Sequence, residues 1–286
     1  MLSTTTLRNL VVNRAHPLCP DYWWKVLPHL NFGGARFLDL VHNSHLLLTS
    51  TTQSPTQGFS LQAPPNGYGS ISIDGTNTCN VIKQDLNLSP NAVNTSNNVS
   101  TNPWSVCAWI NTSHTFSPTG VVIGDYNTAT SGGWIFGISS TNQAVTLAIL
   151  NSNASAGFNV RGTITVNNGV WRHITATFDG TDANGIKLYV DGILDSVTVI
   201  TNSSPTGFVQ NNLMIGDNAG TTHRHFFGQV DDVRVYRKNL SLNDVQYIWQ
   251  NSREGCPGLF VGKARVFSKV TPNPTQVIIF HDDWIA

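Results

Sequence analysis

The run Phe226–Val245 constrains the fold of this chain more than any other segment. Its first part, FFGQVDDVRVY, alternates between apolar and polar side chains, which is typical of a β-strand with one face in a core. Ser241 follows at a position where it can cap a helix that extends to about Ser252. The run therefore predicts a β-strand followed closely by one short helix.

Short alternating segments precede this run, separated by turn residues about every eight to twelve positions, which is the spacing of sandwiches and barrels. Between two of these segments, Asp191 and Gly192 predict a two-residue hairpin turn in which both residues have a positive φ. The predicted strands are 103–110, 121–124, 133–139, 144–151, 159–166, 171–179, 186–190, 193–199, 213–216 and 228–236. The pattern indicates an all-β domain.

Three motifs carry a family resemblance: WRHITATFDG at Trp171–Gly180, IKLYVDG at Ile186–Gly192, and the strand and helix of 226–245. Together they resemble the laminin-G-like members of the concanavalin-A-like lectin/glucanase family, of the kind found in phage and bacterial proteins. The resemblance implies a two-sheet antiparallel jelly-roll sandwich with one short C-terminal helix. It does not set the function, because one fold hosts many functions.

The resemblance covers residues 18–252, where we expect one sandwich domain with its closing helix. Residues 1–17 are expected to form an N-terminal arm, and residues 253–286 a C-terminal arm that contains strands. The last apolar run must complete a sheet edge or pair with another chain. Its predicted assembly residues are Gln276, Val277, Ile278, Ile279 and Phe280.

Charge and hydropathy limit the partners of this chain. Sixteen basic residues balance sixteen acidic ones, so no basic surface for nucleic acid is expected. The sequence shows neither a signal peptide nor an apolar stretch of about 18 residues, which a membrane span needs. We expect neither nucleic acid nor membrane as a partner.

The acidic residues argue against catalysis. Fifteen of the sixteen are Asp, and Glu254 is the only Glu. Glycanases that share the sandwich resemble one another in a strand with two catalytic Glu, and glycoside hydrolysis needs a pair of carboxylates. No GxSxG motif is present either. We therefore assign no catalytic residue and predict that the protein is not an enzyme.

The four cysteines Cys19, Cys79, Cys107 and Cys256 are scattered without a CxxC pair, so reduced thiols are the simplest interpretation. A disulfide between Cys19 and Cys256 is an alternative that spacing cannot decide. Cys107 lies in the apolar run WSVCAWI, where a cysteine acts as a small hydrophobic residue.

The resemblance also implies a calcium site at the rim of the sandwich, built from Asp side chains and loop carbonyls. Asp125 and Asp217 each follow a Gly that ends a predicted strand, and their carboxylates suit a hard cation. His223 and His225 are two residues apart and form either a pair of ligands for a softer divalent metal or two exposed loop histidines. Trp171 and His173 alternate onto one strand face, and the resemblance implies that they pack in the core rather than that His173 has a metal or general-base role.

A glycan site on the rim needs an exposed aromatic ring for stacking and polar side chains that bind hydroxyl groups. The residues in suitable loops are Tyr126, Asn127, Trp134, Asp217 and Asn218. Each of them is equally compatible with a place in the core or in an inert loop.

Two functions follow from these observations. The first is a non-enzymatic virion structural protein, such as a phage head decoration or fibre-associated protein, made in the host cytoplasm. It would assemble with copies of itself and with other virion proteins through its terminal arms, and its sandwich would face outward. The alternative is a soluble carbohydrate-binding adhesion module that recognises a cell-surface glycan. A glycoside hydrolase is the third function considered, and it lacks the expected Glu pair.

Overall fold

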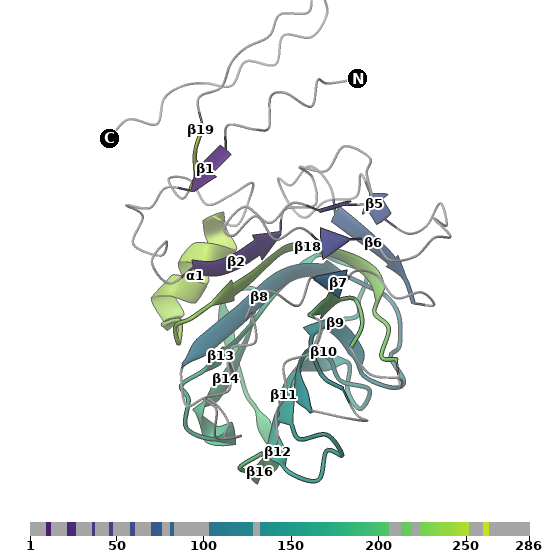
Figure 1. Ribbon diagram of the computed structural model, residues 1–286, viewed down its shortest axis with the longest axis vertical. Helices are drawn as coiled ribbons and strands as arrows, with labels where there is room; N and C mark the ends of the chain where they lie inside the picture. Colours follow the sequence, from purple (N-terminus) through teal and green to yellow (C-terminus); the bar gives the residue numbers. More distant parts are fainter. Residues whose placement is uncertain are drawn as a thin grey trace, which may run out of the picture.

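The computed structural model describes residues 70–75, 103–127, 132–205, 213–218 and 223–251, together with the backbone of short strands elsewhere. These residues form two antiparallel sheets that pack face to face (Figure 1). The prediction of a two-sheet antiparallel sandwich with one short helix is confirmed.

The first sheet contains the middle of the chain and ends in very short strands. Its strand order is β16 (Thr198–Ser203), β12 (Gly157–Thr165), β11 (Ala144–Leu150), β10 (Gly133–Ile138), β9 (Gly120–Gly124), β17 (Met214–Ile215), β7 (Val81–Ile82), β4 (Leu46–Leu47) and β3 (Arg36–Phe37).

The second sheet carries the longest strand of the described chain, β18. Its order is β15 (Ile193–Asp195), β14 (Ile186–Val190), β13 (Arg172–Phe178), β8 (Trp104–Asn111), β18 (Phe227–Tyr236), β6 (Ser70–Asp74) and β5 (Gly58–Ser60), and β2 (Tyr22–Val26) also pairs with β18. Outside both sheets, β1 (Leu10–Val12) pairs with β19 (Phe260–Gly262), so a strand of each predicted arm lies beside the other (Figure 1).

Aromatic side chains from both sheets meet in the core. The ring centroids of Trp104 on β8 and Trp134 on β10 are 5.1 Å apart. Phe158 on β12 and Phe178 on β13 are separated by 5.9 Å. All four rings are buried, and such contacts across the sandwich exclude water between the sheets.

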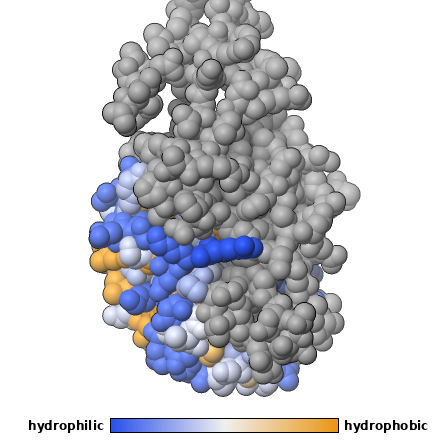
Figure 2. All heavy atoms as spheres, turned by 60° about the vertical axis from the view of Figure 1, so that its left-hand side comes forward, coloured by the Kyte–Doolittle hydropathy of each residue, from blue (hydrophilic) through white to orange (hydrophobic). Residues whose placement is uncertain are grey.

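The predicted strand 193–199 is wrong as a single element. The chain forms β15 at an edge of the second sheet and then β16 at an edge of the first, because it crosses between the sheets at Ser196–Val197. Several exposed apolar residues lie on these two edge strands, among them Ile193, Leu194 and Ile200. Figure 2 shows one face of the described part, with a few apolar residues among mainly hydrophilic ones.

The predicted hairpin turn between β14 and β15 is confirmed. Asp191 and Gly192 have φ values of 51° and 74°, so both occupy the left-handed region that this turn requires. Asp191 also accepts a hydrogen bond from the backbone N–H of His173, at 2.9 Å, and another from Arg172 at 2.7 Å. The turn therefore fixes the start of the neighbouring strand β13.

The helix α1 (Leu242–Asn251) begins one residue after Ser241, as predicted. The Ser241 Oγ accepts a hydrogen bond from the Asp244 N–H, and the Asp244 carboxylate accepts one from the Ser241 N–H. This reciprocal arrangement satisfies backbone donors at the helix start. No helix among the described residues is long and apolar enough to cross a membrane.

Several predicted residues lie outside the described part of the chain. They are Gln276–Phe280 of the proposed assembly strand, Glu254, and the cysteines Cys19, Cys79 and Cys256. Cys107 is described and is buried in β8, as expected of a small hydrophobic residue.

Candidate functional site

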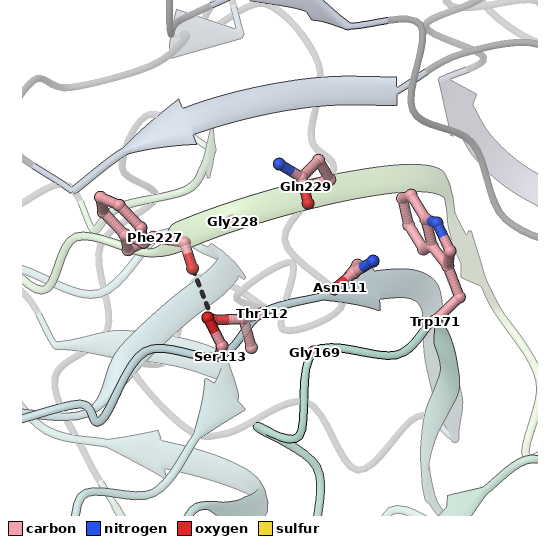
Figure 3. Close-up of a pocket in the computed structure, with 8 residues that line it drawn as sticks. All are labelled: Asn111, Thr112, Ser113, Gly169, Trp171, Phe227, Gly228 and Gln229. Atoms are coloured by element: carbon pink, nitrogen blue, oxygen red, sulfur yellow. Dashed lines mark hydrogen bonds between the residues drawn. The ribbon is translucent and has the colours of Figure 1, made fainter.

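A pocket of about 540 Å³ lies where β8 ends and where β13 and β18 begin (Figure 3). We call it the end pocket. It is lined by Asn111, Thr112, Ser113, Gly169, Trp171, Phe227, Gly228 and Gln229.

The strand register explains why residues so distant in sequence share this pocket. Asn111 on β8 lies opposite Gln229 on β18, and on the other side of β8 Ile110 lies opposite Arg172, the residue after Trp171. The Ile110 side chain belongs to the core. Because side chains alternate along a strand, Asn111 and its partner Gln229 point to the outer face of the sheet.

Buried Thr112 connects the three segments that form the pocket. Its Oγ1 donates a 2.6 Å hydrogen bond to the carbonyl of Phe227 (Figure 3). The same oxygen accepts a 3.0 Å hydrogen bond from the His114 N–H. The Thr112 carbonyl accepts a 2.9 Å hydrogen bond from the N–H of Gly169. One residue thus sets the positions of the β8 end, the β18 start and the turn before β13.

Gly228 permits the close approach of β18 to the end of β8. Its φ is 142°, and a Cβ at this position would lie 2.3 Å from the Asn111 carbonyl oxygen. Any side chain here would push the strands apart, so the pocket depends on glycine at this position.

Two aromatic rings stand at opposite ends of the end pocket, with the amides of Asn111 and Gln229 between them (Figure 3). Phe227 is 45% exposed, and its ring centroid lies 5.1 Å from that of His114. Trp171 is half-buried. None of the eight lining residues carries a charge. The arrangement offers apolar ring faces and neutral hydrogen-bonding groups, which suit an uncharged ligand with hydroxyl groups.

Comparison with known proteins shows the family of this chain. The model of the concanavalin A-like lectin/glucanases superfamily matches residues 87–246, more than half of the 286-residue chain. The chain belongs to this superfamily. A search of curated proteins gave no match.

Solved structures with the same fold are distant in sequence. The binding domain of Paraclostridial Mosquitocidal Protein 1 has a TM-score of 0.54 and 12% identity, with 82% of this chain and 52% of that chain covered. The binding domain of botulinum neurotoxin serotype D has a TM-score of 0.52 and 13% identity, with coverages of 81% and 51%. This chain therefore spans about half the length of those two domains.

A third structure is matched over nearly its full length. Domain 4 of AbnA, a GH43 extracellular arabinanase from Geobacillus stearothermophilus, was solved in complex with arabinotriose. It has a TM-score of 0.52 and 14% identity, with 84% of this chain and 98% of that chain covered. At these identities the likeness establishes the shared sandwich.

Within the superfamily sandwich, two predicted sugar-stacking residues are buried. Trp134 is 0% exposed and packs on Trp104, because β10 lies inside its sheet between β9 and β11. Tyr126 is 1% exposed, and this burial raises the pKa of its phenol although the charge of Arg224 acts in the opposite direction. Of the positions that the sequence left open for these two rings, the structure has both in the core.

Asp125 and Asn127 organise the loop between β9 and β10. The Asp125 Oδ1 accepts a 2.8 Å hydrogen bond from the N–H of Trp134. Asn127 exchanges two backbone hydrogen bonds with Gly132, at 2.9 and 3.0 Å. These contacts give both residues a structural role, and the calcium site predicted at Asp125 stays a prediction.

Asp217 and Asn218 follow β17, which pairs with β9, the strand that precedes Tyr126. Both are 0% exposed. The Asn218 Nδ2 donates a 3.2 Å hydrogen bond to the Tyr126 carbonyl. Asp217 instead faces His223 and His225. The sequence had indicated Asp217 as a calcium ligand and the two histidines as a separate pair, but not that the three residues meet.

Sequence reasoning missed the end pocket. It placed Trp171 in the core with His173, since the two alternate onto one strand face. The structure confirms this for His173, which is 1% exposed, but β13 begins at Arg172 and Trp171 lies just before it at the sheet end. The sequence held one signal for it: the aromatic residue Phe227 and the polar residue Gln229 are two positions apart at the start of β18 and so lie on one face of that strand.

Proposed function

We propose that this chain is a non-catalytic carbohydrate-binding module that holds a neutral glycan in the end pocket. The observation that carries the proposal is the pair of aromatic rings, Trp171 and Phe227, on either side of the amides of Asn111 and Gln229. Sugar rings stack their C–H faces on aromatic rings, and their hydroxyl groups exchange hydrogen bonds with amides.

The comparisons support a binding role. Two similar structures are binding domains of toxins, and the matched arabinanase domain was solved with arabinotriose. A neutral oligosaccharide also suits the uncharged lining of the end pocket. Because two-carboxylate glycoside hydrolysis needs an acid and a base or nucleophile beside the bond, the lack of carboxylates among the eight lining residues supports binding without cleavage.

A glycan array followed by calorimetry with the best ligand tests the proposal. Trp171→Ala and Phe227→Ala should each weaken binding about two- to tenfold, since one aromatic stack contributes about 0.5–1.5 kcal/mol. Leu242→Ala is the control, because it removes another exposed apolar side chain, on α1. Glycan affinity that is unchanged in the Trp171→Ala/Phe227→Ala double variant would place binding elsewhere and overturn the proposal.

The virion structural role predicted from the sequence is the second candidate. One observation favours it: β1 and β19, a strand from each arm, pair with each other outside the sandwich. Among the described strands this two-stranded sheet has no further partner, and an open sheet edge accepts strands from neighbouring chains.

Light scattering separates the two candidates. The mass in solution is measured for the full chain and for a chain without residues 1–17 and 272–286. A defined oligomer that becomes a monomer after truncation supports assembly through the arms. A monomer in both cases contradicts the virion role and leaves the carbohydrate-binding module.

A further inference from the structure

We propose that Asp217, His223 and His225 form a binding site for a divalent transition metal of the zinc class. The three residues come from the two ends of the segment between β17 and β18. Their nearest ligand atoms all lie within 4.8 Å of one another. This site is separate from the end pocket and does not rest on the proposed glycan binding.

The three ligand atoms already face one another. The Asp217 Oδ2 lies 2.7 Å from the His223 Nδ1 and 3.4 Å from the His225 Nδ1. The two imidazole rings are stacked, with centroids 5.0 Å apart and an interplanar angle of 10°. One carboxylate oxygen and two Nδ1 atoms therefore lie together in one cluster.

Backbone hydrogen bonds hold the carboxylate in position. The Asp217 Oδ1 accepts hydrogen bonds from the Asn218 N–H at 2.8 Å and from the Arg224 N–H at 2.9 Å. Asp217 is fully buried, so this orientation is fixed, and the Oδ2 is directed to the histidines. Such second contacts orient metal-ligating carboxylates and are part of a metal site.

The surrounding backbone is also anchored to the sheet. The Phe226 N–H donates a 2.8 Å hydrogen bond to the Gly216 carbonyl, and the Val121 N–H donates a 2.9 Å hydrogen bond to the Arg224 carbonyl. These bonds fix the residues on either side of His225 against β9 and the end of β17. The ligands thus sit on a rigid frame, which favours metal binding because less conformational freedom is lost.

The hydrogen bond between His223 and Asp217 leaves other buried polar atoms in and beside the cluster without a hydrogen-bond partner among the described residues. The Nδ1 of His225 is buried, and it has no hydrogen-bond partner among the described residues. The Oδ1 of the adjacent, fully buried Asn218 is likewise without a partner in that part of the chain. Buried polar atoms are normally satisfied, and a cation between the histidines and Asp217 would satisfy the His225 nitrogen.

The donor set selects the metal. Two imidazole nitrogens and one carboxylate oxygen match zinc and its neighbours, whereas calcium and magnesium take oxygen ligands. Tetrahedral zinc bonds of about 2.0–2.1 Å place neighbouring ligand atoms about 3.3 Å apart. The 3.4 Å separation fits, and the 2.7 Å one must widen by a small shift of His223, whose side chain is 47% exposed. Three protein ligands leave a coordination position for water or a further ligand.

The test uses the full chain after dialysis against a chelator. Calorimetry should show that the wild type binds one equivalent of Zn²⁺ and that the His223→Gln/His225→Gln double variant does not. Each single variant should bind Zn²⁺ more than about tenfold more weakly, since even the loss of an outer contact lowers metal affinity by this factor. Titration with Co²⁺ should produce the visible absorption of a tetrahedral complex in the wild type, and the double variant should not.

His114→Gln is the matched control, because it removes an exposed histidine that is not part of the cluster. Zn²⁺ should raise the Tm of this control and of the wild type, since a ligand of the folded state stabilises it, but not the Tm of the double variant. Equal Zn²⁺ binding by the wild type and the double variant overturns the proposal. Binding of Ca²⁺ that is lost in Asp217→Asn, but retained in the histidine variants, also overturns it.

Discussion

At the scale of single residues, His173 shows how burial sets the charge state of a group. Its side chain is 1% exposed, and its ring lies 5.3 Å from that of Trp109. The pKa of His173 is lowered to about 3, mainly by burial and also by the charge of Arg234, while the charge of Asp232 acts in the opposite direction. His173 is therefore neutral in the folded protein at physiological pH.

This neutrality predicts a loss of stability in acid. The pKa of His173 is about 3 when folded and about 6.5 when unfolded, so between these values only the unfolded chain takes up the proton. The free energy of unfolding should fall by about 1.4 kcal/mol per pH unit as the pH drops from 6 to 4. Urea melts at several pH values measure this slope.

The same melts on variants identify the residue responsible. The contribution of His173 to the slope should disappear in His173→Gln, which has no proton to gain in this range. It should persist in His114→Gln, which leaves His173 in place. Equal slopes in the wild type and His173→Gln would mean that other groups cause the acid sensitivity.

The partner of Asp232 illustrates what the sequence could not reveal. Alternation along QVDDVRVY predicts that one Asp of the pair Asp231–Asp232 points inward, where backbone donors of neighbouring loops would satisfy it. Asp232 is buried and pairs with the fully buried Arg234, whose Nε donates to the Asp232 Oδ1 at 2.8 Å. The pairing register of β18 shifts between Asp231 and Arg234, and Asp232 has a φ of 47°. This bulge breaks the alternation on which the expectation depended.

At the scale of elements, the sequence predicted the strands and turns that depend on neighbouring residues. Alternation and turn residues located most of the strands between residues 103 and 236 to within a few positions, and Asp191–Gly192 specified its own turn geometry. The crossing from β15 to β16 was missed because an apolar run does not show when a chain changes sheets. The end pocket was missed because Asn111, Trp171 and Phe227 meet only through the strand order β13, β8, β18.

The start of α1 allows a direct test of capping. Ser241→Ala removes the Oγ that accepts from the Asp244 N–H, at 3.2 Å, and that donates to the Asp244 carboxylate, at 2.8 Å. The free energy of unfolding should fall by about 1 kcal/mol, the usual effect of losing a serine cap. Ser241→Thr is the comparison, since the threonine hydroxyl can both accept from the Asp244 N–H and donate to its carboxylate, and should keep most of the stability. Equal destabilisation by both substitutions in urea melts would show that the cap is not the cause.

At the scale of the whole molecule, both the segment before α1 and the helix itself are joined to the second sheet. The Ser105 Oγ on β8 donates to the Lys238 carbonyl at 2.6 Å and accepts from the Leu240 N–H at 3.0 Å. A Cβ at Gly192 would lie 2.7 Å from Trp249, so the indole packs directly on the turn between β14 and β15. The helix therefore belongs to the sandwich and not to the arm that follows.

These contacts support the proposal that residues 18–252 are one folding unit and that both arms are separate from it. The strand β2 and the helix α1 lie inside this range and contact the second sheet, whereas β1 and β19 lie outside it and, among the described strands, pair only with each other.

A chain of residues 18–252 should therefore unfold in one cooperative transition, with a Tm close to that of the full chain. Calorimetry and circular dichroism on both chains measure this. A chain that ends at residue 240, before α1, is the control and should melt at a lower temperature, because the turn at Gly192 loses the covering Trp249. If the 18–252 chain were to lose its cooperative transition, one of the arms would be part of the folding unit.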